Sequence, residues 1–303
     1  MRHSVKTSRN IWCYVSLDFL TKLMVNAIIS LFDRQYYQLR KDANVKTALL
    51  NFKKYRYLLV ELVKKDIKLK YRRSYLGILW TLLEPILTTI VLTLVFSKVL
   101  GRGDASYPVF ILTGRLLYGF FSKSTRASMS SIRRNSGMIK KVYVPKYIYP
   151  LSTALSEFII FLISLIVLFG AMIIFNVKPT VHIFKGIIPI IILLVLSLGV
   201  GLILSTLAVF FRDLEYLWGV ALMLIMYTSA VFYDAERLGL GRKAQIFRLN
   251  PLFDIILNFR NAVLYGRPFD MEALIISAVI SFGSLIIGVL LFYKQQDKFI
   301  LYI

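Results

Sequence analysis

Six long apolar runs, separated by short segments rich in lysine and arginine, dominate this chain from residue 76 onward. A helix that crosses a bilayer needs about 20 mostly apolar residues. The runs of this length are Leu76–Phe96, Val109 to about Ser128, Ile148–Phe175, Ile183–Phe210, Leu214–Phe232 and Ala273–Tyr293. Because 57% of the 303 residues are hydrophobic, a water-soluble domain would have too little polar surface to cover itself. We therefore predict an all-α polytopic membrane protein with six transmembrane helices.

The second run is the least regular, because Arg115, Lys123 and Arg126 interrupt it. The distribution of Lys and Arg predicts the orientation. With the N-terminus inside, 27 of the 38 basic residues lie on the inner side, 10 lie on the outer side, and Arg115 belongs to neither. Cytoplasmic loops carry the excess of positive charge, so both termini are predicted to be cytoplasmic. Anionic lipid then accounts for the formal charge of +22 without any nucleic-acid partner.

The sequence before the first crossing predicts two further segments. Residues 1–50 form an N-terminal extension, cytoplasmic or interfacial; its fairly apolar part, Tyr14–Phe32, carries Asp18, Lys22 and Asn26, which disfavours a seventh crossing or a cleavable signal. Residues 51–74 are predicted to form an amphipathic helix in the headgroup plane, and residues 75–303 the six-span transmembrane domain. The apolar residues of the helix recur at i, i+3 and i+4, and they are Tyr55, Leu58, Leu59, Leu62, Val63, Ile67 and Tyr71.

This helix carries Glu61 and Lys65 on its other face in the favourable i, i+4 order. It is either a lipid anchor or the docking surface for a soluble partner, and periodicity does not separate the two. Asn135 is predicted to stop the helix of the second crossing, with Arg133 and Arg134 in its last turn. Phe211–Asp213 is predicted to form a tight inner turn.

A short re-entrant or interfacial helix is predicted before the last crossing. Asn250 is placed to cap it, Pro251 to occupy its first position and Gly266 to end it. Cys13 is the single cysteine, the chain has two isolated histidines, and no Gly-x-x-x-x-Gly-Lys-Ser/Thr motif occurs. We expect no disulfide, no metal site and no Walker A nucleotide site in this chain.

An ordered set of short motifs resembles type-2 ABC exporter permeases, and most closely those that export O-antigen, teichoic acid or capsular polysaccharide. The set covers residue 53 to the end. The motifs are Asp66–Trp80, Glu84-Pro85, the Asn135 to Pro145 loop, Phe211-Arg212-Asp213 and Leu249-Asn250-Pro251. The chain departs from the family pattern at Arg115, Leu117, Tyr118 and Ala230, and residues 1–50 have no counterpart in it.

The resemblance implies a homodimer of permease subunits above two copies of a separate ATPase, which binds the ATP and Mg²⁺, and a lipid-linked glycan as substrate. It also implies that the amphipathic helix and the Ser128–Lys141 loop after the second crossing contact the ATPase. The residues predicted to couple to it are Glu61, Lys65, Arg133, Arg134, Asn135, Arg212 and Asp213.

Two further residue sets are predicted to meet the substrate in the cytoplasmic (inner) membrane. Basic side chains near the inner surface suit an anionic lipid head, and they are Lys70, Arg72, Arg73 and Arg115. Arg115 has a competing structural interpretation, as a snorkelling side chain or an ion-pair partner of Glu84. Aromatic rings stack on sugars, and those predicted to line a glycan conduit are Tyr118, Phe121, Tyr227, Phe232 and Tyr233.

Two other functions fit parts of the sequence. An exporter of a drug or small lipid would differ only in its substrate. A membrane-embedded glycosyl- or phosphotransferase would need paired carboxylates or a metal site, and no Asp-x-Asp motif or His cluster occurs. Small residues recur every four positions at Ser197, Gly201 and Ser205 and again at Ala273, Ser277 and Ser281, which predicts close helix packing rather than substrate contact.

Overall fold

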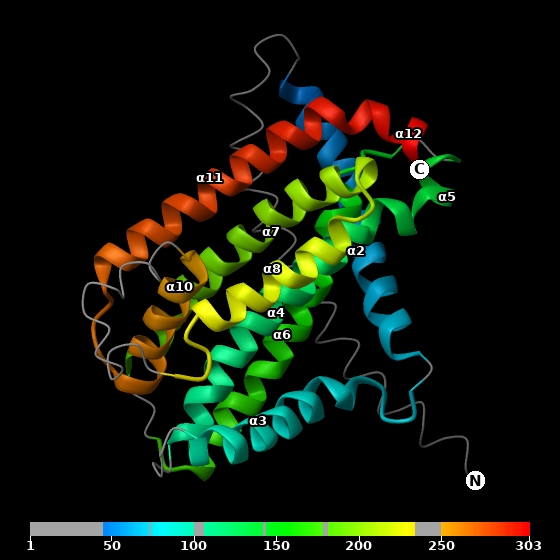
Figure 1. Ribbon diagram of the computed structural model, residues 1–303. Helices are drawn as coiled ribbons and strands as arrows, with labels where there is room; N and C mark the ends of the chain where they lie inside the picture. The colour runs from blue at the N-terminus through cyan, green and yellow to red at the C-terminus, as the bar shows by residue number, and fades with distance from the viewer. Residues whose placement is uncertain (1–44, 73, 100–105, 142–143, 178–180, 234–249) are drawn as a thin grey trace. The chain divides into compact units, whose positions relative to one another are not determined.

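The computed structural model describes residues 45–72, 74–99, 106–141, 144–177, 181–233 and 250–303, which are helical wherever they are regular (Figure 1). The chain divides into two units, Met1–Arg72 and Arg73–Ile303, and each is considered by itself. The predicted segment Tyr14–Phe32 lies outside the described residues. The long helices of the second unit are α3 (Trp80–Val99), α4 (Tyr107–Arg134), α6 (Ile148–Ile174), α7 (Ile187–Phe210), α8 (Leu214–Thr228), α10 (Pro251–Arg260) and α11 (Met271–Gln295).

The first unit contains helix α2 (Val45–Tyr71), which starts before the predicted amphipathic segment and ends close to its predicted end. Leu59, Leu62 and Ile67 of the predicted apolar stripe are buried, while Lys68 and Arg72 are exposed. The alternation expected from the sequence is therefore present along the described side chains of this helix. The division at residues 50 and 51 stays a prediction, because α2 runs across it.

Helices α4 and α7 form the centre of the second unit. Helix α4 packs against α6 and α7, and α7 packs in turn against α11, as Figure 1 shows for the neighbouring ribbons. In the apolar span Ile183–Phe210, which contains α7, 67% of the most apolar stretch is buried. The corresponding share is 22% in Met271–Tyr302, at the C-terminus, and 11% in Gly77–Lys98, which contains α3. The peripheral helices therefore expose much apolar surface, as expected of a protein surrounded by lipid.

Among the described residues, four helical stretches are long and apolar enough to cross a membrane, and they are Gly77–Lys98, Ile148–Ile174, Ile183–Phe210 and Met271–Tyr302. They confirm a polytopic membrane protein. The predicted second crossing is a continuous helix, α4, whose charges keep its overall hydropathy low. The predicted fifth crossing ended at Phe232, whereas α8 ends at Thr228 after 15 residues. Ala230 follows in the left-handed region at φ 48°, so the helix ends before the predicted end of this crossing at Phe232. The six-span count stays a prediction.

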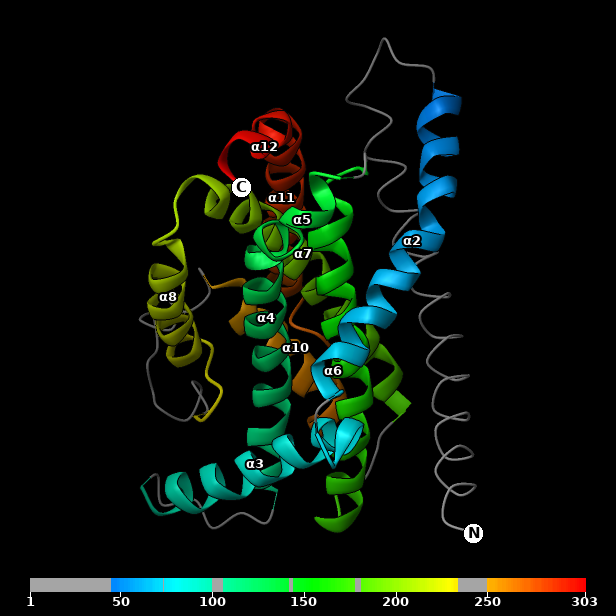
Figure 2. The same cartoon turned by 90° about the vertical axis from the view of Figure 1, so that its right-hand side faces the viewer.

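The first apolar helix, α3, also differs from a simple crossing. It follows a short 3-10 turn, η1 (Gly77–Leu79), and contacts both α4 and α6. In Figures 1 and 2 it runs crosswise to these two helices rather than alongside them. Its far end meets the start of α4, where Phe96 packs near Tyr107 and Phe110.

Helices α7 and α11 approach each other most closely at two glycines. A Cβ on Gly199 would lie 2.5 Å from the backbone nitrogen of Leu285, and one on Gly288 would lie 2.7 Å from the carbonyl oxygen of Gly199. The predicted small-residue stripes are also buried, at Ser197, Ser205, Ala273, Ser277 and Ser281. A Cβ on Gly201, in the first stripe, would lie 2.9 Å from the side chain of Ser128 on α4. These stripes hold helices together, as the sequence indicated.

The short helix before α11 has the predicted ends. The side chain of Asn250 accepts a hydrogen bond from the backbone N–H of Leu252, and Gly266 at φ 60° ends the π-turn η4 (Asn261–Tyr265). Almost all of α10 is buried, which favours the re-entrant interpretation over the interfacial one. Asn258 exchanges two hydrogen bonds with the backbone of Asp270, at 2.9 and 3.3 Å, and so fixes α10 to the start of α11.

The last turns, η5 (Gln296–Lys298) and α12 (Phe299–Tyr302), pack against the start of α6 and the end of α7. The Lys146 ammonium donates a hydrogen bond to the carbonyl of Gln296, 2.5 Å away, and Phe299 packs edge-on against Phe210 and Phe292. Burial lowers the pKa of Lys146, and the nearby Asp297 carboxylate acts in the opposite direction. The C-terminal turns are therefore part of the bundle.

Candidate functional site

Helix α4 has a polar face that runs from Arg115 to Arg134. Between Arg115 and Arg134, every residue of α4 that is not buried is Arg, Lys, Ser, Gly or Ala. We call this set the polar face, and its members are Arg115, Gly119, Ser122, Lys123, Arg126, Ala127, Ser130, Arg133 and Arg134. They recur at spacings of three and four residues and so share one side of the helix. A surface that faces lipid is apolar, so this face is suited to water or to a polar solute.

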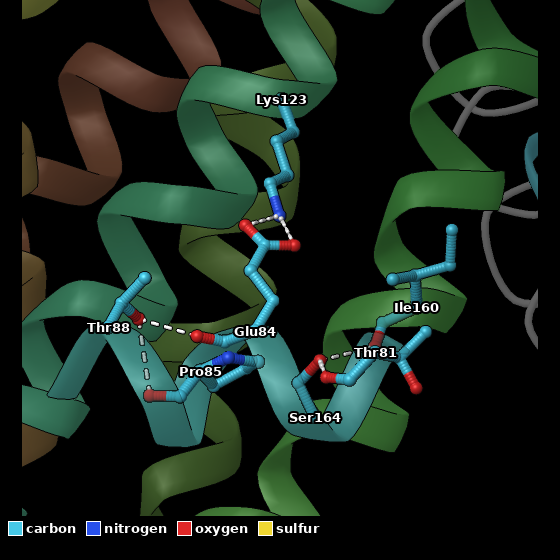
Figure 3. A network of polar contacts seen from close by, with 7 residues as sticks. All are labelled: Thr81, Glu84, Pro85, Thr88, Lys123, Ile160 and Ser164. Carbon is cyan, nitrogen blue, oxygen red and sulfur yellow. Dashed lines mark hydrogen bonds and ion pairs between the residues drawn. The ribbon is translucent and has the colours of Figure 1, made fainter. Parts of the chain in front are cut away.

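An ion pair lies at the edge of the polar face near α3. The Lys123 ammonium lies 2.6 and 2.8 Å from the two carboxylate oxygens of Glu84 (Figure 3). The two side chains are 42% and 46% exposed, which leaves the pair open to a solute. The sequence offers Glu84 as a structural partner of Arg115, and the structure corrects this: the partner of Glu84 is Lys123, two turns further along α4.

The backbone around Glu84 is held in place despite the proline that follows it. Pro85 has no N–H, so the carbonyl of Thr81 loses its helical partner. Ser164 of α6 replaces it by donating a hydrogen bond to that carbonyl at 3.0 Å. The Thr88 hydroxyl donates to the carbonyl of Glu84 at 2.7 Å (Figure 3). A satisfied backbone lets α3 continue through Pro85 and present Glu84 to Lys123.

The other edge of the polar face meets α8. The Tyr118 hydroxyl donates to the carbonyl of Leu222 at 2.9 Å, and the Trp218 indole N–H donates to the hydroxyl of Thr125 at 3.1 Å. At the end of α4, the Arg133 guanidinium forms an ion pair with Glu215. Sequence reasoning missed Trp218 and Glu215. The position of Glu215, two residues after Asp213 in the predicted inner turn, was the available signal.

The aromatic residues predicted to line a glycan conduit lie in different environments. Tyr118 and Phe121 are buried between α4 and α8, and Phe232 is buried in a parallel stack with Phe96, 4.7 Å between ring centres. Tyr227 is 55% exposed, and the Tyr233 hydroxyl donates to its carbonyl at 2.6 Å. Tyr227 is thus an exposed member of the set, and the glycan conduit stays a prediction.

A buried arginine that sequence reasoning missed joins α10 to α4 and to the turn after α8. The Arg260 side chain donates to the carbonyls of Ala230, Val231 and Phe110 at 2.8, 3.0 and 3.1 Å. Its guanidinium carbon lies 3.5 Å from the centre of the Phe110 ring. Gly114 makes room for it, since a Cβ there would lie 2.7 Å from the guanidinium.

Some of the residues predicted to couple to an ATPase lie at the end of α4 and in the nearby α7–α8 turn. Asn135 ends α4 as predicted, with its side-chain amide donating to the carbonyl of Ser131 at 2.8 Å, and a further short helix, α5 (Ser136–Ile139), follows it. Arg134, Arg212 and Asp213 are exposed. The Arg133–Glu215 pair links the end of α4 to the α7–α8 turn that carries Arg212.

The remaining predicted residues lie on α2 or just after it. Glu61 pairs with Lys64 at 3.5 Å, and Lys65 is half-buried. Among the predicted headgroup residues, Lys70 and Arg72 are exposed, whereas Arg73 lies outside the described residues. Their roles stay predictions.

Comparison with known proteins places this geometry in context. A family model described as ABC-2 type transporter matches residues 57–264. The O-antigen export system permease protein RfbA of Klebsiella pneumoniae is 30% identical over 244 residues, which cover 80% of this chain and 93% of that protein. The polysialic acid transport protein KpsM of Escherichia coli is 23% identical over 240 residues, with 77% and 91% covered. The capsule polysaccharide export inner-membrane protein CtrC of Neisseria meningitidis is 21% identical over 184 residues, with 58% and 68% covered.

Proposed function

This chain belongs to the ABC-2 type transporter family, and from that premise we propose that it exports a lipid-linked polysaccharide across the cytoplasmic membrane. It is the permease subunit, and ATP hydrolysis belongs to a separate partner. The relatives named for O-antigen, polysialic acid and capsule export support a glycan of the O-antigen, capsule or teichoic acid class. The relative named as an inner-membrane protein supports the location.

The observation that carries the proposal is the polar face of α4. A helix largely surrounded by other helices presents five cationic side chains and no large apolar one along this face. Charged side chains at membrane depth mark the path of a polar or ionic substrate. A phosphorylated glycan carrier needs such a polar path for its charged and hydrated groups, whereas an uncharged apolar drug does not.

Two copies of the permease and two copies of the ATPase form the proposed assembly, with six crossings in each permease and both termini in the cytoplasm. This orientation is supported by the excess of Lys and Arg in residues 1–75 and in residues 133–147, at the inner end of α4 and in the loop after it. In a symmetric dimer, two polar faces turned toward each other would repel unless water or an anion lay between them. The dimer is therefore expected to enclose a wet path.

Coupling to the ATPase is proposed to run through the inner ends of α4 and α8. The Arg133–Glu215 pair ties these ends together, so a push on the loop after α4 is passed to α8. The exposed residues Arg134, Arg212 and Asp213 offer charged contacts to the partner, as Glu61 and Lys65 do on α2. The headgroup of the carrier is proposed to arrive near Lys70 and Arg72.

The test is purification of the permease together with its ATPase subunit, followed by mass spectrometry of the lipid that remains bound. A polyprenyl-linked glycan in the complex, and its ATP-dependent transfer into sealed inverted vesicles, are the expected results. Recovery of a permease that binds no ATPase, or transfer of a small lipid without any glycan, would refute the proposal.

A further inference from the structure

The cations of the polar face are spread over the depth of a membrane. Arg115 and Arg133 are 18 residues apart on one helix, which corresponds to about 27 Å at 1.5 Å per residue. The hydrocarbon core of a bilayer is about 30 Å thick. Lys123 and Arg126 lie between them on the same face, so a positive charge occurs roughly every 5 to 12 Å along the path.

Only part of this charge is balanced by acidic side chains. Within the described part of the chain, Glu84 pairs with Lys123 and Glu215 pairs with Arg133. Arg134 donates to the carbonyl of Ala127 at 2.9 Å, and neither Arg115 nor Arg126 forms an ion pair with a described residue. Five cations thus face two carboxylates, and the polar face keeps a net positive charge.

The chemistry of Arg115 and Arg126 indicates that the ligand of the polar face is an anion. An arginine keeps its charge at any physiological pH, and its planar guanidinium binds a phosphate or carboxylate through two parallel hydrogen bonds. Gly119 adds room on the same face, since no atom lies within 4 Å of a Cβ built there. An anion can therefore reach the helix surface between Arg115 and Lys123.

We propose that the polar face of α4 is a track for the anionic group of the exported molecule, a phosphate or a carboxylate, with Arg115 and Arg126 as its principal contacts. The inference rests on the proposed export function and deepens it. The track lowers the cost of moving an anion through the membrane by offering a cation at each depth. Glu84 and Glu215 temper the attraction at Lys123 and Arg133, and moderate binding at several sites lets an anion leave as well as enter.

The track is tested with the permease–ATPase complex in lipid nanodiscs and two pairs of probes. Farnesyl diphosphate is compared with neutral farnesol, and a sialic acid oligomer with a neutral glucose oligomer. Binding is measured for the wild type, for Arg115→Gln with Arg126→Gln, and for the charge-preserving Arg115→Lys with Arg126→Lys. Lys294→Gln on α11, an exposed cation away from the polar face, is the control. The single variant Arg126→Gln, at an exposed position, serves if the double variant does not fold.

The wild type is expected to bind at least one anionic probe and neither neutral one. Each guanidinium removed should weaken binding about tenfold, so the double Gln variant should lose about a hundredfold. The Lys variant should lose less, and the control should match the wild type. If the Gln variants lose binding of farnesyl diphosphate alone, the track binds the lipid phosphate. If they lose binding of the sialic acid oligomer alone, the track binds acidic sugars.

The inference is overturned if neither anionic probe binds, or if the Gln variants bind and export as the wild type does. The proposed function has a separate readout, namely glycan export by the wild-type complex. If the wild-type complex binds an anionic probe but exports no glycan, the proposed glycan substrate is wrong and the anion track still stands. Normal export by the double Gln variant counts against the track alone.

Discussion

At the scale of single residues, Arg260 is the side chain whose loss should cost most. It is 4% exposed and satisfies three backbone carbonyls. Arg260→Met would leave these carbonyls without their donor, at about 1–3 kcal/mol for each buried group left unpaired. We expect the melting temperature of the purified protein to fall sharply, with Arg260→Lys intermediate.

The control for this prediction is Arg267→Met. Arg267 is exposed and lies over the Tyr265 ring at 5.2 Å, so its loss should change the stability by no more than about 0.5 kcal/mol. Equal melting temperatures for Arg260→Met and Arg267→Met would show that Arg260 does not hold the turn at Ala230. Sequence reasoning missed Arg260 because nothing in the local pattern of α10 shows that residues 110, 230 and 231 converge on it.

Contacts between residues distant in the sequence also explain why Glu84 pairs with Lys123 and not with Arg115. The sequence shows an acid in one apolar run and three bases in the next, and the choice among the bases depends on how the two helices cross. Helix α3 crosses α4 at a position that brings Glu84 to Lys123. In contrast, the Asn250 cap and the Gly266 end were predictable, because a cap depends only on residues within the same few positions.

At the scale of helices, the α7–α11 contact gives a clear pair of substitutions. Gly199→Ala should lower the free energy of unfolding, because its Cβ would lie 2.5 Å from atoms of both Leu285 and Ser284. Gly283→Ala on α11 meets no atom within 4 Å and should be neutral or stabilise by up to about 1 kcal/mol, as alanine does in a helix. Thermal unfolding of both variants in detergent measures the contrast. If Gly199→Ala melts at or above the wild type, the close approach of the two helices is wrong.

Coupling to the ATPase belongs to the same scale. Reversal of charge at Arg133, Arg134 and Arg212 together should weaken recovery of the ATPase subunit or separate ATP hydrolysis from export. Glu215→Gln is the comparison variant for the α4–α8 link, because it breaks the Arg133 ion pair and leaves the basic surface in place. Normal complex recovery and export in the triple variant would refute the coupling assignment. Equal defects in both variants would place the effect in the α4–α8 link and not in the surface charge.

At the scale of the whole molecule, the class of protein followed from the sequence, and the arrangement of the crossings did not. Long apolar runs indicate membrane helices by composition alone, and four of the described helical stretches are long and apolar enough to cross. The end of α8 at Thr228 was not predictable, because apolar residues continue to Phe232 and the turn depends on contacts from α10. The polar face was present in the sequence as the interruptions at Arg115, Lys123 and Arg126, and only the burial of the remaining residues of α4 shows that it is one surface.

The predicted orientation is tested by cysteine labelling in cells, in a Cys13→Ser background that has no other cysteine. A cysteine at Gly103 or Asn176 should react with a membrane-impermeant thiol reagent added outside, and one at Asn135 should react only after the membrane is opened. Both expectations follow from the excess of basic residues on the side of Asn135. Labelling of Asn135→Cys from outside would contradict the six-span topology.

The most direct test of the central claim is a cysteine scan of α4 in the assembled transporter, again in the Cys13→Ser background. A small water-soluble thiol reagent is applied, and the reaction rate at each position is measured with and without ATP. Substitutions on the polar face are Gly119→Cys, Ser122→Cys, Ala127→Cys and Ser130→Cys. Substitutions at buried positions are Leu117→Cys, Phe120→Cys, Ser124→Cys and Met129→Cys. If the polar face lines a path for a polar substrate, the first set reacts at helical spacing and the second does not. Protection of the first set, or equal reaction of both, would contradict a polar path along α4.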